Sequence, residues 1–306
     1  MKRKAYGRDA GLSFRMLFTT SLLGLLYVLF AVALFYLLNA GLILMIIIVG
    51  GVAFLQYFTS DKIALAASGA KVVSPDEAPQ LHEMVERLCG MADLPKPRVA
   101  VIESDVPNAF ATGRNKKHAA VAVTSGLWNR LGPREVEGVL AHELSHIANR
   151  DVLVMTVAGF FATVAALLTR FGFYGGMFGG FGGGNRDNNN SVPVWLIVLL
   201  VSIVTYFLSQ ILILALSRYR EFAADRGSAL ITGAPEYLMS ALQKIASGIT
   251  QIPQQDLRQV EGMNAFFIIP TNWKSRAGGL FMTHPPLEKR LEALAEIARQ
   301  MGRPVS

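Results

Sequence analysis

Four long apolar stretches constrain this chain more than any other feature of its sequence. They cover residues 16–39, 41–58, 152–171 and 193–216. Each has a length within the range of about 17–25 residues that crosses the hydrocarbon core of a bilayer as a helix. Only 17% of all residues are charged, whereas soluble proteins average about 25%. The sequence therefore predicts a membrane protein with four transmembrane helices in a lipid bilayer.

The first apolar stretch follows a basic segment. Residues 1–15 hold five basic side chains and one aspartate, which gives a net charge of +4. Positively charged flanks stay on the cytoplasmic side, so we expect the N-terminus in the cytoplasm. The stretch is longer than the apolar core of about 7–15 residues in a signal peptide, and a second span follows at once. We therefore expect it to remain as an anchor.

Four crossings return the chain to the cytoplasm and divide it into four parts. Residues 1–60 form the basic segment and two transmembrane helices, and 151–216 form a transmembrane hairpin with a glycine-rich outer loop at 172–192. Residues 61–150 and 217–306 are the two halves of one cytosolic domain, which is long enough for one ordinary core. Much of the net charge lies in the basic segment, so no nucleic-acid partner is needed. A single cysteine excludes an internal disulfide.

A pattern typical of zinc hydrolases stands just before the third span. It reads His142-Glu143-Leu144-Ser145-His146. Two histidines four residues apart share one face of a helix, so both imidazoles can bind a single zinc ion. The glutamate between them is then placed to take the proton of a water molecule that the ion activates. The pattern predicts His142 and His146 as metal ligands and Glu143 as the general base.

A catalytic zinc site usually has a third protein ligand. Glu221 and Asp225 are four residues apart just after the fourth span. We assign Glu221 to the ion and Asp225 to orienting His142 from behind. The swapped assignment stays open, as does a surface helix whose acids pair with neighbouring arginines. Because His146 precedes the third span and Glu221 follows the fourth, an antiparallel hairpin would bring the two side by side.

The pattern of the first cytosolic half indicates a small sheet packed against helices, an α+β arrangement. Apolar and β-branched runs predict strands at 97–103, 108–113 and 118–124. A helix is expected from Ser74 to about Cys89, since Ser74-Pro75-Asp76-Glu77 has the composition of a helix start. Gly132-Pro133 opens the helix that carries the two histidines.

The order of these features resembles that of the HtpX family of membrane zinc metalloproteases, which shares a peptidase family with the type 1 CAAX prenyl protease. The resemblance rests on two N-terminal spans, Ala141 to His146, two further spans, Glu221-Phe222-Ala223-Ala224-Asp225, and Thr283-His284-Pro285-Pro286. It implies a gluzincin-like fold with one zinc ion per chain and endopeptidase activity on polypeptides, among them misfolded membrane proteins. It also implies a bacterial inner-membrane location and a part in stress-related quality control.

The resemblance implies two further assignments. His284 corresponds to an additional active-site histidine aimed at the reaction intermediate. The local sequence around it fits equally well a turn before a helix. The strand at 108–113 corresponds to an edge strand beside the cleft, on which an extended peptide could pair main chain to main chain. The residues expected to bind substrate are Asn108, Ala109, Phe110, Ala111 and Thr112.

Two other functions use the same features. A prenyl-protein protease would have the same zinc chemistry, but four spans are few for an enclosing chamber. A membrane scaffold with structural zinc would need a closed site with four ligands, usually cysteines. The single cysteine argues against that scaffold.

Overall fold

Two compact units make up the structure, which is a computed structural model of the whole chain. The first unit comprises residues 1–56 and 155–216, and the second comprises 57–154 and 217–306. The glycine-rich loop predicted at 172–192 lies mostly outside the described residues. The described residues are 9–38, 42–177, 193–252, 267–269 and 284–303.

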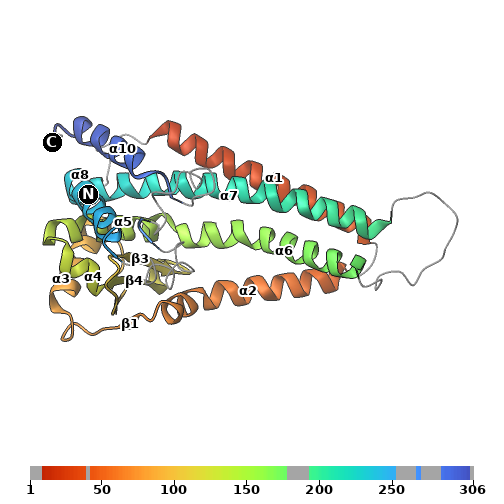
Figure 1. The fold of residues 1–306 in the computed structure, drawn as a ribbon, viewed down its shortest axis with the longest axis horizontal. Coiled ribbons are helices and arrows are strands. Elements are labelled where there is room, and N and C mark those ends of the chain that lie inside the picture. The colour runs from red at the N-terminus through yellow and green to blue at the C-terminus, as the bar shows by residue number, and fades with distance from the viewer. Residues whose placement is uncertain (1–8, 39–41, 178–192, 253–266, 270–283, 304–306) are drawn as a thin grey trace. The chain divides into compact units, whose positions relative to one another are not determined.

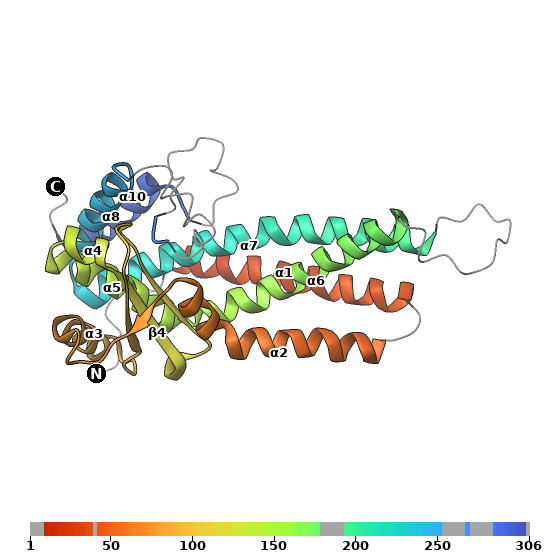
Figure 2. The ribbon, with the colours of Figure 1, turned by 60° about the horizontal axis from the view of Figure 1, so that its bottom comes forward.

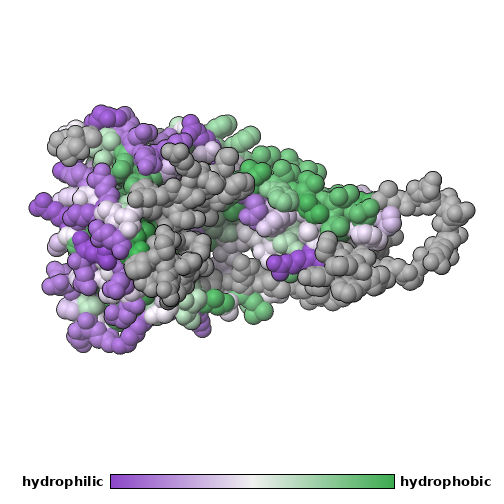
Figure 3. Space-filling view, in the orientation of Figure 1, coloured by the Kyte–Doolittle hydropathy of each residue, from purple (hydrophilic) through white to green (hydrophobic). Residues whose placement is uncertain are grey.

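Long apolar helices form the first unit (Figure 1). They are α1 (Ala10–Leu38), the first part of α2 (Leu42–Ala67), and most of α6 (Asp151–Met177) and α7 (Val194–Thr232). Phe30 of α1 packs with Ala165 of α6 and Val198 of α7. Large apolar side chains also face outward, as Phe207 does with 62% of its surface exposed. Figure 3 shows a band of hydrophobic surface over this unit.

Apolar surface of this extent is expected where lipid replaces water as the solvent. Among the described residues, three helices are long and apolar enough to cross a membrane: Ala10–Tyr36, Asp151–Arg170 and Val194–Thr232. The chain is therefore a membrane protein. The stretch predicted at 41–58 is helical within α2, and its crossing of the bilayer stays a prediction.

A four-stranded sheet lies at the centre of the second unit, in the order β1-β2-β4-β3 (Figure 2). The strands are β1 (Lys71–Val72), β2 (Arg98–Ile102), β3 (Ala109–Gly113) and β4 (Ala119–Thr124). β2 and β4 are parallel, whereas β1 pairs with β2 and β3 with β4 in antiparallel fashion. Within the part of the chain that the structure describes, β3 is consequently an edge strand of this sheet.

Both faces of the sheet are buried at β4. Because side chains alternate along a strand, Val121 and Val123 of β4 enter the main core, while Ala120 and Ala122 pack on the opposite face with Leu65 of α2. This burial explains why β4 reads as an unbroken apolar run, with all six residues buried.

Helix α5 (Pro133–Asn149) is the central helix of the second unit. It packs against α3 (Pro79–Ala92), α8 (Pro235–Ile249) and the strands β3 and β4. Gly132 donates its backbone N–H to the Glu135 carboxylate at 2.7 Å, which caps the first turn as in a capping box. Among the described residues, the unit also contains the short α4 (Ser125–Arg130), the 3₁₀ turn η1 (Lys116–His118), α10 (Leu287–Gln300) and the C-terminal parts of α2 and α7.

The helix predicted to start at Ser74 begins five residues later, at Pro79. Ser74 and Glu77 do form the reciprocal bonds of a helix start, with the Ser74 N–H 2.7 Å from a Glu77 carboxylate oxygen. They close only a single turn, because the residue before a proline is disfavoured in the helical region. Ala78 accordingly has φ −141° and ψ 64°.

Gly138 allows α5 and α8 to approach closely. A Cβ at this position would lie 2.7 Å from the backbone nitrogen of Leu238 and 2.9 Å from the carbonyl carbon of Tyr237. Gly138→Ala is therefore expected to lower the free energy of unfolding by about 1–3 kcal/mol through overpacking. Thermal unfolding of the detergent-purified chain would measure this. Gly90→Ala in α3 is the control, since no neighbouring atom lies within 4 Å of its Cβ position, and equal losses in the two variants would contradict the prediction.

Candidate metal centre and active site

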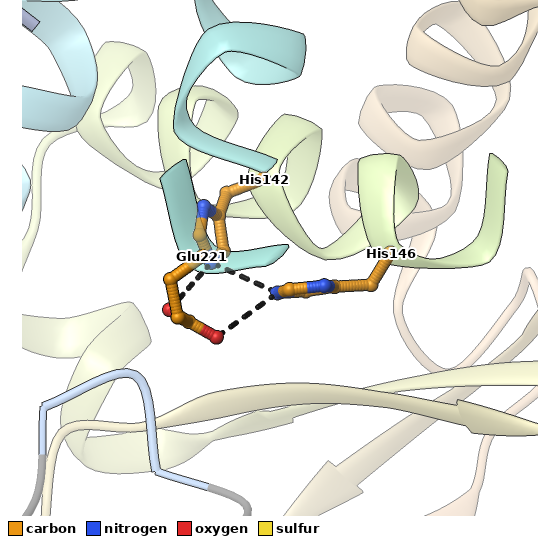
Figure 4. A group of neighbouring side chains, drawn as sticks. All are labelled: His142, His146 and Glu221. Carbon is orange, nitrogen blue, oxygen red and sulfur yellow. Dashed lines mark hydrogen bonds and ion pairs between the residues drawn. The ribbon is translucent and has the colours of Figure 1, made fainter. Parts of the chain in front are cut away.

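Two histidines of α5 meet a glutamate of α7 in the interior of the second unit (Figure 4). The Nε2 atoms of His142 and His146 are 3.1 Å apart. The Glu221 carboxylate lies beside both, with Oε2 3.6 Å from His142 Nε2 and Oε1 3.5 Å from His146 Nε2. One ligand atom from each residue falls within 4.8 Å of the other two. The structure thus brings together side chains that are far apart in the sequence.

These spacings suit a tetrahedral metal ion. Ligand atoms about 2.0–2.1 Å from a tetrahedral zinc are about 3.3–3.4 Å from one another, close to the observed 3.1–3.6 Å. Two imidazole nitrogens and a carboxylate oxygen are donors that zinc accepts, and all three side chains are buried or nearly so. The residues therefore fit a divalent cation.

The two imidazoles differ in their affinity for a proton. Burial alone would lower the pKa of His142, but Asp225 and Glu221 raise it to about 9. Burial lowers the pKa of His146 to about 4, and the charge of His142 adds to this effect. A histidine binds a metal ion only through an unprotonated ring nitrogen, so binding should weaken as pH falls.

Asp225 lies behind His142, away from Glu221. Its Oδ1 is 3.0 Å from His142 Nδ1, one helical turn along α7 from Glu221. Arg290 of α10 holds this carboxylate on both oxygens, with Nε donating to Oδ2 at 2.9 Å and Nη2 to Oδ1 at 2.6 Å. Arg290 also donates from Nη1 to the carbonyl of Ile268 at 2.8 Å.

The sequence patterns did not reveal Arg290. It is 1% exposed and lies 3.4 Å from Glu221 Oε2, so it touches both carboxylates of α7. The signal that could have found it is its place on α10, where it stands on the same helical face as Leu287, Leu291 and Leu294. A charged side chain within an apolar stripe needs a buried partner.

Glu143 follows His142 on α5 and is 4% exposed. Burial raises the pKa of its carboxyl group; nearby His142 and His146, and a hydrogen bond from the backbone of Ala111, oppose that rise. A raised pKa brings a carboxylate closer to the range in which it can accept a proton and later return it. The bond to Ala111 also places Glu143 against the edge strand β3.

The segment predicted to bind substrate is β3 with the residue before it. Ala109 to Thr112 lie in β3, next to Glu143 through Ala111. Asn108 has a different surrounding, because its side-chain oxygen accepts a hydrogen bond from the Ile268 N–H at 3.0 Å. The structure thus places the Asn108 side chain in a contact with the segment that precedes α10, and the binding of substrate by residues 108–112 stays a prediction.

His284 belongs to the cluster. Its Nδ1 lies 3.1 Å from Glu221 Oε2, and its side chain is 9% exposed. His82 and His118 have other partners, the Val73 carbonyl and the Asn115 side chain, each at 3.0 Å. Cys89 is buried, and burial raises the pKa of its thiol to about 11. Within the described residues, His142, His146 and Glu221 are the one group arranged for a metal.

The sequence profile of peptidase family M48 matches residues 75–298, which make up most of the chain. The chain belongs to peptidase family M48. The M48 chain is 51% identical to a protein named protease HtpX homolog 2 from Methanosarcina acetivorans, over 99% of this chain and 100% of that one. It is 51% identical to a protease HtpX homolog from Moorella thermoacetica, over 98% of both. The resemblance inferred from the motifs is confirmed, and this M48 chain is a metalloprotease.

A solved structure supports the fold. The M48 chain matches Ste24p of S. mikatae with a TM-score of 0.52 and 17% identity, over 89% of this chain and 62% of that one. The chain therefore spans less than two thirds of that protein. At this identity the match concerns the fold alone, which is mostly helical with a small sheet.

Proposed function

We propose that this chain is a zinc-dependent endopeptidase of the plasma (inner) membrane that cleaves misfolded or damaged membrane proteins. The observation that carries the proposal is the meeting of His142, His146 and Glu221 within 4.8 Å, with Glu143 beside them on α5. Two imidazoles and one carboxylate are a ligand set of catalytic zinc sites, which leave a coordination position for water or substrate.

Each residue of the site has a distinct part in the proposed reaction. When bound, zinc supplies Lewis-acid chemistry, which polarises a peptide carbonyl and lowers the pKa of water. Glu143 takes the proton of the attacking water and passes it to the leaving amine. His284 donates to the negative oxygen of the intermediate, a contact typically worth about 10²–10³ in rate. Asp225 holds the His142 ring with Nε2 toward the ion.

The edge strand β3 suggests how substrate binds. β3 pairs with β4 on one side, and an extended peptide can add to an edge strand through main-chain hydrogen bonds. Such pairing reads the backbone, so cleavage should tolerate many side chains. Tolerance of this kind suits removal of damaged proteins whose sequences have nothing in common.

The membrane helices support both the location and the substrate class. The basic residues 1–15 favour a cytoplasmic N-terminus, and an even number of spans would place both halves of the protease domain on that same side. An enzyme anchored in this way would meet membrane proteins at the inner surface of the bilayer.

Metal content and proteolysis of the full chain test the proposal together. The detergent-purified protein should bind one zinc ion per chain and cleave reduced, alkylated α-lactalbumin, which is permanently unfolded. His142→Ala should lose both zinc and cleavage. Glu137→Gln is the matched control on α5, because Glu137 pairs with the half-exposed Arg87 on the helix surface, and it should keep both.

Two results would contradict the proposal. Cleavage restricted to prenylated C-terminal peptides would identify a prenyl-protein protease instead. Bound zinc that neither supports cleavage nor exchanges its fourth ligand for a hydroxamate would indicate a structural metal site.

A further inference from the structure

His146 has its own carboxylate partner, which the sequence pattern does not reveal. Asp151 Oδ2 lies 2.6 Å from His146 Nδ1, on the side of the ring away from Glu221. In an uninterrupted helix, residues five positions apart point about 140° away from each other, so this contact could not form. The chain is interrupted between the two: α5 ends at Asn149 and α6 begins at Asp151.

Arg150 makes the interruption. It adopts φ 58° and ψ 39°, the left-handed conformation that non-glycine residues disfavour. Its backbone N–H still bonds to the carbonyls of His146 and Ile147 and so closes α5. The turn redirects the next residue, and the Asp151 carboxylate then faces back toward His146. A disfavoured backbone conformation is thus retained at the one point that brings these two side chains together.

The second oxygen of Asp151 is held by Arg220, with Oδ1 3.0 Å from Nε. Both side chains are almost fully buried, at 5% and 6% exposure. Arg220 immediately precedes Glu221 on α7, so one turn of this helix supplies both a candidate metal ligand and the arginine. Asp151 therefore lies between the two side chains, with one carboxylate oxygen toward Arg220 and the other toward His146.

We propose that Asp151 is a positioning residue for the metal centre, and that Arg220 holds it in place. Asp151 accepts the Nδ1 proton of His146, which fixes the tautomer in which Nε2 carries the free electron pair toward the ion. The inference rests on the proposed zinc function. Each histidine then has a carboxylate and an arginine behind it. Asp225 and Arg290 hold His142, and Asp151 and Arg220 hold His146.

Zinc affinity is the measurement that tests this role. Carboxylates behind metal-bound histidines typically contribute about 10–100-fold to metal affinity. Asp151→Asn in the full chain should therefore raise the zinc dissociation constant by about 10–100-fold, measured by competition with a chromogenic chelator. Arg220→Lys keeps the positive charge but loses the Nε contact, and it should raise the constant by a smaller factor. Glu137→Gln again is the control and should leave it unchanged.

A second measurement separates positioning from a purely structural role. The melting temperature of chelator-treated protein reports the fold without metal, and the visible spectrum of the cobalt-substituted protein reports the geometry of the ligands. Weaker zinc binding and an altered cobalt spectrum, in a variant that still unfolds cooperatively, would support the inference. Unchanged affinity in Asp151→Asn would overturn it. If Asp151→Asn does not fold, unchanged affinity in Arg220→Lys would overturn it.

Failure of this inference can be distinguished from failure of the proposed function. A wild-type chain that binds no zinc would overturn the proposed function and this inference together. A wild-type chain that binds zinc and cleaves protein, alongside an Asp151→Asn variant of equal affinity, would overturn the inference alone.

Discussion

Glu143→Ala is expected to slow peptide cleavage by about 10²–10⁴-fold while zinc stays bound. Glu143 adjoins His142 on α5 but is not one of the three clustered ligand residues, so its loss leaves the metal ligands in place. General acid–base catalysis typically contributes about 10²–10⁴ in rate, and we expect a loss of that order. Initial rates of α-lactalbumin cleavage, with zinc measured on the same samples, would check both parts of the prediction.

The burial of Glu143 adds a dependence on pH. The base must be ionised to accept a proton, and burial raises the pKa of this carboxyl group. Activity should therefore fall as pH decreases through a pKa above that of an ordinary glutamate. Full activity in Glu143→Ala, or loss of zinc together with activity, would contradict its role as the base.

The sequence alone predicts much of the helix that carries the two histidines and of the sheet beside it, because both depend on local patterns. The spacing of His142 and His146 depends only on helix geometry, and the turn at Gly132-Pro133 fixes where α5 begins. The strand expected at 118–124 is observed at Ala119–Thr124, because an apolar β-branched run buried on both faces has few alternatives. The protease family was confirmed by its relatives.

The supporting residues could not be found in the same way. Arg290 meets a carboxylate 65 residues earlier in the chain. Its place in the apolar stripe of α10 signals a buried partner, but no local pattern says which residue that partner is. Asp151 could not be predicted because helical periodicity places it on a different face from His146. The two side chains meet only because Arg150 changes the direction of the backbone between them. Both depend on tertiary contacts or on a disfavoured conformation, and such departures from local rules are expected near functional sites.

Arg290→Met should cause a larger loss of stability than Gly138→Ala. Arg290 is 1% exposed and makes two hydrogen bonds to Asp225 and one to the Ile268 carbonyl. Methionine is similar in length but would leave the buried Asp225 charge without its cation, which typically destabilises a protein by about 3–5 kcal/mol. A decrease in melting temperature of roughly 10 °C would correspond to this loss.

The same substitution should also disturb the metal centre, since Asp225 would lose the contacts that keep it behind His142. Arg299→Met is the matched control on α10. Arg299 pairs with Glu296 at 2.7 Å, but both side chains are more than half exposed, and exposed pairs contribute little to stability. Because the two variants replace the same residue type on the same helix, the difference between them isolates the buried contacts of Arg290, of which the two to Asp225 are the largest part. A melting temperature in Arg290→Met equal to that in Arg299→Met would mean that Asp225 does not depend on Arg290, and the account of how His142 is supported would then be wrong.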